Sequence, residues 1–155
     1  ASITSLDTTG SVGSYSSVTT GADGLGLISY YDATNSDLKV AHCINTACNA
    51  ATITSLDTTG TVGNHSSITI GADGLGLISY LDGTNADLKV AHCINTVCTD
   101  STVTSLDTTG NVGYHSSVTI GTDGLGLISY YDSTNADLKV AHCGNTFCLP
   151  YFRRR

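Results

Sequence analysis

Hydrophobic and polar residues alternate along short segments of the chain, and turn-forming residues separate these segments. In "SSITIG", residues 66–71, Ile68 and Ile70 alternate with Ser67 and Thr69. This period of two predicts a strand with one buried face. The segment "LGLISYL" is apolar on both faces, which predicts a strand sandwiched between two layers. The same unit therefore contains four predicted strands, over 51–57, 66–71, 75–81 and 88–93.

Two tight turns and one longer connection link these strands. "ADG", residues 72–74, predicts a hairpin turn in which Gly74 takes a positive φ. "DGTNAD", residues 82–87, is rich in side chains that bond their own backbone, which also predicts a turn. "TTGTVGNH", residues 58–65, has no periodicity, so we expect a loop that crosses between strands.

The chain consists of three copies of this unit. Residues 51–100 and 101–150 are identical at 38 of 50 positions without a gap. A fixed period of this length is typical of repeat proteins. We therefore divide the chain into repeats at 1–50, 51–100 and 101–150, followed by a basic tail at 151–155. Because the copies are so similar, most positions reflect the folding unit rather than a site.

Each repeat contains a Cys-x4-Cys pair. If the strand ending at Cys43 and the segment starting at Cys48 form a hairpin around "INTA", the two cysteines face each other within disulfide range. The loop is short, so each bridge is expected to contribute roughly 2 kcal/mol. The predicted disulfides are Cys43–Cys48, Cys93–Cys98 and Cys143–Cys148. Such bridges indicate an oxidising compartment, so we expect the protein outside the cell or at the cell surface.

Four antiparallel strands joined by hairpins, then a longer connection to the next copy, are the layout of a β-propeller blade. The unit "SSITIGADGLGLISYLDGTNADLKVAHC", with its paired cysteines, resembles blades of bacterial secreted β-propellers related to sialidase-like and lectin propellers. The chain has no Trp and so lacks the Trp-containing signatures of those families. The resemblance implies an all-β fold of three four-stranded antiparallel blades. A β-trefoil is the alternative, because it closes three such units within one chain.

The strand count predicts that the blades need partners. In a blade, 66–71 would be the innermost strand and 51–57 the outermost, which makes the outer-type strand at 1–7 surplus. Propellers have four to eight blades, so three cannot close a ring. We expect other copies of the chain to complete the assembly, as a ring or a filament. The segment "LPYFRRR", 149–155, breaks the repeat and is interpreted as a natural C-terminus whose charge protects an open edge.

Composition excludes some partners. The net charge is −7 and the only basic cluster is at 153–155, so binding to nucleic acid is not expected. No apolar run reaches about 18 residues, so no membrane span is expected. All thirteen acidic residues are Asp, which suits turns.

Two patterns suggest metal ligands. The histidines at 42, 92 and 142 each precede a cysteine, but neighbouring strand residues point to opposite faces. We therefore expect hydrogen-bonded histidines rather than a zinc site. The second turn of each repeat gathers oxygen ligands of the kind that Ca²⁺ binds. Two carboxylates per turn are few and their spacing differs from that of an EF-hand loop, so Asx-type turns are the preferred interpretation. The possible calcium ligands are Asp32, Asn35, Asp37, Asp82, Asn85, Asp87, Asp132, Asn135 and Asp137. No other cofactor is expected.

A possible sugar site lies before the inner strand, at Tyr15, His65 and His115. Their rings could stack on a sugar and bond to it. The tyrosines that recur in the second strand, Tyr30, Tyr80 and Tyr130, are expected to pack between blades. The aspartates all belong to predicted turns, so a pair of catalytic carboxyls is not expected, and the protein is predicted not to be an enzyme.

Two functions remain open. The first is a self-assembling structural component of the extracellular surface. The alternative is a multivalent carbohydrate-binding propeller, in which equal weak sites add through avidity.

Overall fold

The structure is a computed structural model that describes residues 1–149. It contains only strands, turns and loops in this range. The strands are β1 (Val12–Thr20), β2 (Gly26–Asp32), β3 (Asp37–Cys43), β4 (Ala51–Asp57), β5 (Val62–Ile70), β6 (Gly76–Asp82), β7 (Asp87–Cys93), β8 (Ser101–Asp107), β9 (Val112–Ile120), β10 (Gly126–Asp132) and β11 (Asp137–His142). The predicted basic tail at 151–155 lies outside the described residues.

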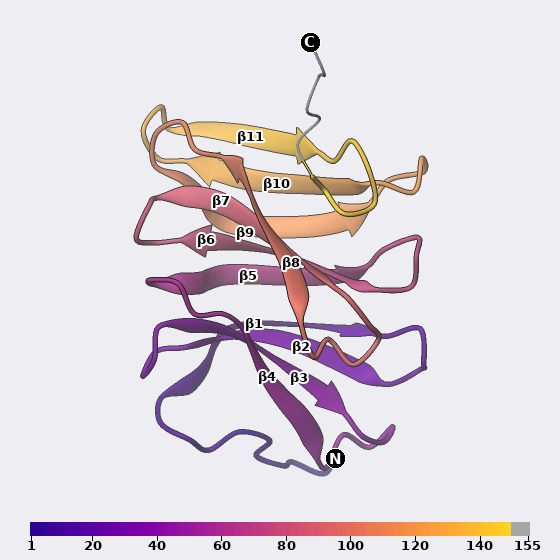
Figure 1. The fold of residues 1–155 in the computed structure, drawn as a ribbon. Coiled ribbons are helices and arrows are strands. Elements are labelled where there is room, and N and C mark those ends of the chain that lie inside the picture. Colours follow the sequence, from indigo (N-terminus) through magenta and orange to yellow (C-terminus); the bar gives the residue numbers. More distant parts are fainter. Residues whose placement is uncertain (150–155) are drawn as a thin grey trace.

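The strands form three separate antiparallel sheets, which we call blades. Blade 1 is β1-β2-β3-β4, blade 2 is β5-β6-β7-β8, and blade 3 is β9-β10-β11. The blades stack face to face in chain order, with blade 1 at the N-terminal end (Figure 1). Along one edge of the stack, the inner strand β5 contacts the inner strands β1 and β9 on its two sides. This arrangement is propeller-like, as predicted, and it differs from the alternative β-trefoil because each sheet is separate.

Each outer strand comes from the repeat after its blade. β4 opens the second repeat but pairs with β3 of the first, with Ala41 opposite Ile53. β8 pairs with β7 in the same way, with Ala91 opposite Val103. Blades 1 and 2 therefore have the four predicted strands, whereas blade 3 has three within residues 1–149.

Two strand predictions are wrong at their edges. Residues 1–7 form no strand, because no strand of the described chain pairs with them. The inner strand β5 starts at Val62, inside the predicted crossing loop. The register shifts between Val62 and Asn64 and again before Ser67. These β-bulges remove the alternation of side chains, so the sequence pattern there is typical of a loop.

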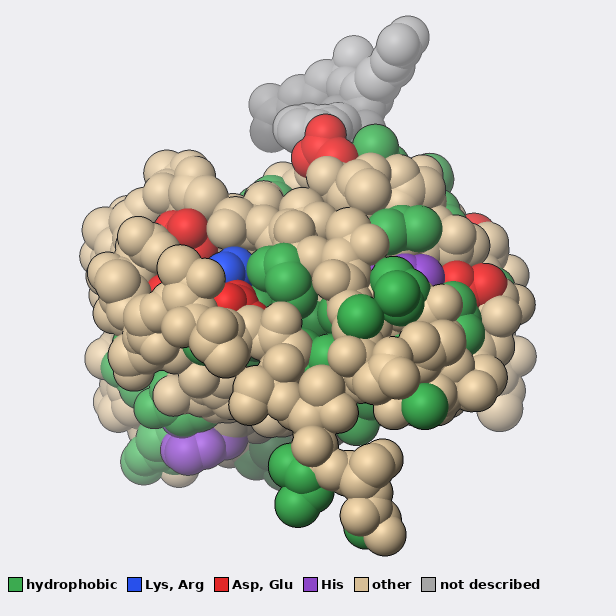
Figure 2. Space-filling view, turned by 90° about the horizontal axis from the view of Figure 1, so that it is seen from below, with side chains coloured by type: hydrophobic (Ala, Val, Ile, Leu, Met, Phe, Trp, Pro, Cys, Tyr) green, Lys and Arg blue, Asp and Glu red, His purple; other side chains and the backbone are tan. Residues whose placement is uncertain are grey.

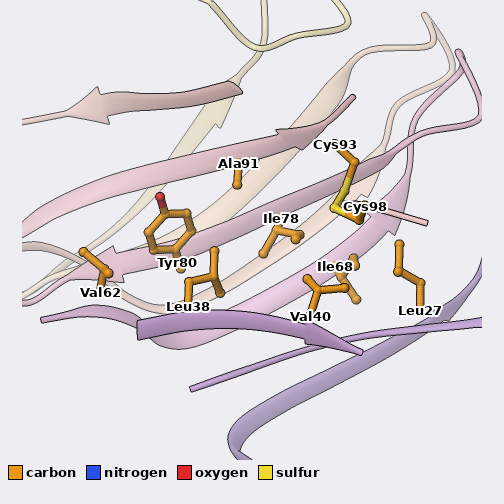
Figure 3. Packing of buried hydrophobic residues seen from close by; sticks show 10 residues of the cluster. All are labelled: Leu27, Leu38, Val40, Val62, Ile68, Ile78, Tyr80, Ala91, Cys93 and Cys98. Atoms are coloured by element: carbon orange, nitrogen blue, oxygen red, sulfur yellow. A yellow bond between two sulfur atoms is a disulfide. The ribbon is translucent and has the colours of Figure 1, made fainter. Parts of the chain in front are cut away.

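Apolar side chains fill the two junctions between blades. At the first junction, Leu27, Leu38 and Val40 of blade 1 pack against blade 2. Figure 3 shows Leu38 next to the ring of Tyr80, together with the rest of this cluster. The second junction repeats the arrangement, with Leu77, Leu88 and Val90 of blade 2 packed against blade 3. The core of the protein thus lies between blades.

The three disulfides are present, but their local geometry differs from the prediction. The Cα atoms of Cys43 and Cys48 lie 4.9 Å apart. Cys43 pairs across the strands with Ala51 rather than with Cys48. Cys48 instead lies in the connecting turn, where its backbone N–H donates to Asn45 and its φ is 48°. Cys93–Cys98 repeats this arrangement, with Cys93 opposite Ser101. Cys143–Cys148 has the same turn at Cys148, but Cys143 lies just beyond the end of β11 and has no partner on an outer strand within the described residues.

Candidate functional site

The bulged start of each inner strand presents one ring, and the three rings form a continuous row. Tyr15, His65 and His115 take φ values of 53°, 54° and 52°, a left-handed backbone that is uncommon outside glycine. Such bulges re-aim side chains. The ring centroids of Tyr15 and His65 lie 4.4 Å apart, as do those of His65 and His115. We call Tyr15, His65 and His115 the aromatic row.

Two tyrosines flank the aromatic row. Tyr31 lies 6.3 Å from Tyr15, and Tyr114 lies 5.5 Å from His65, measured between ring centroids. Tyr15 and His115 are exposed, and His65 between them is partly buried. Histidine side chains next to hydrophobic ones are visible at one edge of the blade 1 end of the stack (Figure 2). The row is therefore open to solvent.

Serines beneath the aromatic row hold the bulged backbone in place. The Ser66 hydroxyl donates to the carbonyl of Tyr15 at 2.8 Å and lies 2.9 Å from the hydroxyl of Ser29. The Ser116 hydroxyl donates to the carbonyl of His65 at 2.8 Å and is paired with Ser79. Because these hydroxyls are buried or partly buried, their hydrogen bonds fix the position of each ring in the row relative to the ring of the next blade.

The surroundings of the histidine in the middle of the row favour its neutral form. Burial lowers the pKa of His65 below its usual value of 6.5, and the charge of His115 lowers it further. A neutral imidazole offers one donor, one acceptor and a π face. The aromatic row thus combines flat apolar surface with hydrogen-bonding groups, which is the combination that can hold a polyhydroxylated ring.

A second set of polar groups repeats between the blades and was missed in the sequence. The carboxylate of Asp57, at the end of β4, accepts hydrogen bonds from Tyr80 at 2.8 Å and Lys89 at 2.7 Å. Both donors belong to blade 2, so this buried network ties the blades together. Asp107 makes the same contacts with Tyr130 and Lys139. The signal in the sequence is the lysine that interrupts the apolar pattern of "LKVAHC".

The same network exists at blade 1, where Asp7 accepts from Tyr30 and Lys39, both at 2.7 Å. Burial raises the pKa of the Asp7 carboxyl, but hydrogen bonds from Lys39 and Tyr30 outweigh it, and the pKa falls to about 2. Burial also raises the pKa of Asp57, and the bonds from Lys89 and Tyr80 bring it below its usual value. These carboxylates are charged partners of lysines.

The histidines beside the cysteines bind aspartates of the hairpin turn. His42 Nε2 lies 2.8 Å from Asp23, and His92 and His142 lie 2.8 Å and 2.7 Å from Asp73 and Asp123. Each pair ties the first turn of a repeat to the third strand. Within residues 1–149 no group of three or more His, Cys, Asp or Glu side chains is arranged to hold a metal ion.

The predicted calcium ligands lie in hairpin turns. Asp32 accepts from the backbone N–H groups of Thr34 and Asn35, and from the Asn35 side chain at 2.9 Å. Asp37 is the strand partner of Asp32 at the turn. Asp82 and Asp132 make the same turn contacts in the other repeats. Calcium binding stays a prediction.

Comparison with known proteins supports the fold but assigns no family. No protein-family model matches the chain, and no curated protein matches it. An α-L-arabinofuranosidase from Lactobacillus brevis has a similar structure, with a TM-score of 0.58 and 12% identity over 86% of this chain and 50% of its own. An endo-arabinase from Bacteroides thetaiotaomicron VPI-5482 gives a TM-score of 0.55 and 13% identity over 83% and 54% of the two chains.

A third similar structure is a fucose lectin from Kordia zhangzhouensis in complex with methyl-fucoside. Its TM-score is 0.50 and its identity 11%, over 84% of this chain and 99% of that one. The chain spans about half the length of the two glycosidases. At these identities the comparisons show a shared propeller-like fold. Among the described residues no helix is long and apolar enough to cross a membrane.

Proposed function

We propose that the protein is an extracellular, non-enzymatic carbohydrate-binding module. The aromatic row is the observation that supports this proposal. Its rings offer stacking surface for the C–H face of a sugar, and neutral His65 offers a donor and an acceptor to sugar hydroxyls. The proteins of similar structure include one described as a fucose lectin and two described as glycosidases. The disulfides are in keeping with an oxidising, extracellular location.

A binding role is proposed in preference to catalysis because the carboxylates already have local partners. Asp57 and Asp107 bind lysines, Asp82 and Asp132 bind turn groups, and Asp73 and Asp123 bind histidines. A glycosidase needs two carboxyl groups that face one sugar bond. These six aspartates therefore already stabilise turns and contacts within and between blades.

A glycan array, followed by calorimetric titration with methyl-fucoside as the first probe, tests the proposal. We expect binding that weakens by about tenfold or more in Tyr15→Ala, since a lost stacking contact costs roughly 1.5 kcal/mol. Phe147→Ala is the matched control. Tyr15 is 47% exposed and Phe147 46% exposed, but Phe147 contacts His92 in another part of the fold. Silence of the wild-type protein across the array would remove the proposal.

A self-assembling structural component is the second candidate function, and the exposed Leu138 and Val140 on blade 3 favour it. Negative-stain microscopy separates the two. Discrete particles that bind glycans support the lectin function, whereas long filaments without glycan binding support the structural one.

A further inference from the structure

The outward face of blade 3 exposes side chains that are buried in the other blades. Leu138 is 84% exposed and Val140 is 63% exposed. Their counterparts Leu38, Val40, Leu88 and Val90 are fully buried at the junctions between blades. Leu127 is also exposed, whereas Leu27 and Leu77 are buried. We call Leu127, Leu138 and Val140 the blade 3 end face.

The outward face of blade 1 is the opposite half of the same kind of junction. Val18 is 69% exposed, whereas its counterparts Ile68 and Val118 are buried against a neighbouring blade. A cavity of about 240 Å³ opens on this face, lined among others by Val12, Gly13, Tyr30 and Ala41. We call Val12, Gly13, Val18, Tyr30 and Ala41 the blade 1 end face. Figure 2 looks at this end of the stack, where hydrophobic side chains reach the surface.

The cavity is lined by counterparts of the residues that pack around Leu38 at the first internal junction. At the first internal junction, Leu38 packs in one cluster with Val62, Tyr80 and Ala91 (Figure 3). These three residues are the repeat counterparts of Val12, Tyr30 and Ala41, which line the cavity. The leucine that corresponds to Leu38 and has no blade to enter within this chain is Leu138.

The surroundings of three equivalent glycines show independently that the blade 1 end face lacks a neighbouring blade. A Cβ on Gly63 would lie 2.7 Å from the Cα of Leu38, and one on Gly113 would lie 3.0 Å from the Cα of Leu88. Gly13 occupies the same place in blade 1, yet nothing lies within 4 Å of its Cβ position. The close backbone approach made at both internal junctions is thus unfilled at the blade 1 end face.

Residues 1–7 carry an outer-strand sequence without a strand to pair with. "ASITSLD" matches "ATITSLD" of β4 at six of seven positions, but it forms no strand, and Ile3 is 98% exposed. At its end, Asp7 already binds Tyr30 and Lys39 as Asp57 binds Tyr80 and Lys89. On blade 3, a second cavity of about 220 Å³ lies beside β11, lined by Ala141, His142 and Cys143 among others.

We propose that the blade 3 end face of one copy docks head to tail on the blade 1 end face of a second copy, whose residues 1–7 add to β11 as the fourth strand of blade 3. The junction is continuous with the two internal ones, which fixes its register. From the pairs Lys39–Ser55, Ala41–Ile53 and His42–Thr52, residues Lys139, Ala141 and His142 face Ser5, Ile3 and Ser2 of the second copy.

The polar contacts of the junction follow from the same correspondence. Internally, Ser29 pairs with Ser66, and the backbone N–H of Ile68 donates to Ser17 at 3.2 Å. Across the new junction, Ser129 pairs with Ser16 of the second copy, and Val18 N–H of that copy donates to Ser117. The serines that these contacts require, Ser16, Ser117 and Ser129, occupy the corresponding positions. The proposal does not rest on carbohydrate binding, although it places Tyr15 of the second copy beside His115.

A complementation experiment tests the head-to-tail geometry. Leu138→Asp disables one end face and Val18→Asp the other, so each variant alone is expected to remain a single chain. An equimolar mixture retains one intact junction and is expected to form a 1:1 complex. Ile94→Asp is the control, because Ile94 is an exposed hydrophobic of blade 2, whose two faces are covered. Size-exclusion chromatography with light scattering measures the mass of these four samples and of the wild-type protein.

The wild-type protein and the control are expected to associate, and each end-face variant to weaken association by about 30-fold or more. Wild-type protein that stays a single chain at high concentration would overturn the proposal. Association by one variant alone, or folded variants that fail to combine, would also overturn it, because either outcome requires different contacts.

Hydrogen exchange of the wild-type protein provides a readout without substitutions. The backbone amides of Ile3 and Ser5 are expected to become protected only at concentrations where the protein associates. Association that leaves residues 1–7 unprotected would show that they do not form the outer strand of blade 3.

Discussion

Strands β6 and β10 have almost the same sequence, "GLISYLD" and "GLISYYD", but very different surroundings. Every residue of β6 is buried, whereas in β10 buried and exposed residues alternate. Blade 2 is covered on both faces, whereas blade 3 is covered on one. The neighbouring blades therefore decide which residues of a strand are buried. A strand that is apolar on both faces is fully buried only where a blade packs on each side of it.

The largest effect is expected from shortening the same leucine at the two positions. Leu88→Ala should lower the free energy of unfolding by about 2–5 kcal/mol, because it leaves a cavity between blades 2 and 3. Leu138→Ala should change it by only about 0.5 kcal/mol or less in dilute protein. Urea titration measures both. Equal losses in dilute protein would contradict the difference between the blades.

The disulfides extend the comparison to the rim of each blade. Removing Cys93–Cys98 by a double substitution with alanine should cost roughly 2 kcal/mol from loop entropy. The cost should be larger than for Cys43–Cys48, because Cys98 is buried against a neighbouring blade and Cys48 is only half-buried. Denaturant titration under oxidising conditions checks the order. A larger loss at Cys43–Cys48 would show that packing does not add to the bridge.

The tyrosine networks should show a smaller difference. Tyr80→Phe removes a buried hydrogen bond to charged Asp57 and should cost about 1.5 kcal/mol. Tyr30→Phe removes the bond to Asp7, which belongs to a segment without strand pairing, and should cost less. Thermal unfolding of both variants, with Tyr114→Phe as a control, measures the effect. An unchanged melting temperature in Tyr80→Phe would contradict a stabilising role for the network.

The smallest effect is expected from pH. The pKa of Asp57 is lower in the folded chain than its usual 3.8, so its ion pair stabilises the fold above that value. This stability is lost as the pH falls through the folded pKa. Unfolding free energy measured between about pH 6 and about pH 2 should therefore decline on acidification. The decline should be shallower in Asp57→Asn than in the wild-type protein. Asp107→Asn should reduce the slope by a smaller amount, because its partner Lys139 is more exposed than Lys89. Identical slopes in all three proteins would refute this assignment.

The repeated strands could be predicted because their patterns are local. The predicted 51–57, 75–81 and 88–93 correspond closely to β4, β6 and β7. The start of β5 was missed because the bulge at His65 breaks the alternation of side chains. The lack of a strand at 1–7 could not be seen, because strand formation there depends on a partner and not on the sequence itself.

The aromatic row was partly predictable. Tyr15, His65 and His115 were identified by their common place before the inner strand, and the structure brings them together. Their 4.4 Å spacing depends on the stacking of blades, which no single repeat specifies. The link from Asp57 to Tyr80 and Lys89 joins groups 23 and 32 residues apart, so local patterns could not connect them.

The offset between repeat and blade has a consequence for how such a chain changes length. Each complete blade takes its first three strands from one repeat and its last from the following one. A gene duplication of one period therefore adds one whole blade, wherever in the repeat the breakpoints fall. The architecture tolerates unequal recombination between copies, because any fusion that keeps the spacing between repeats restores every junction between blades.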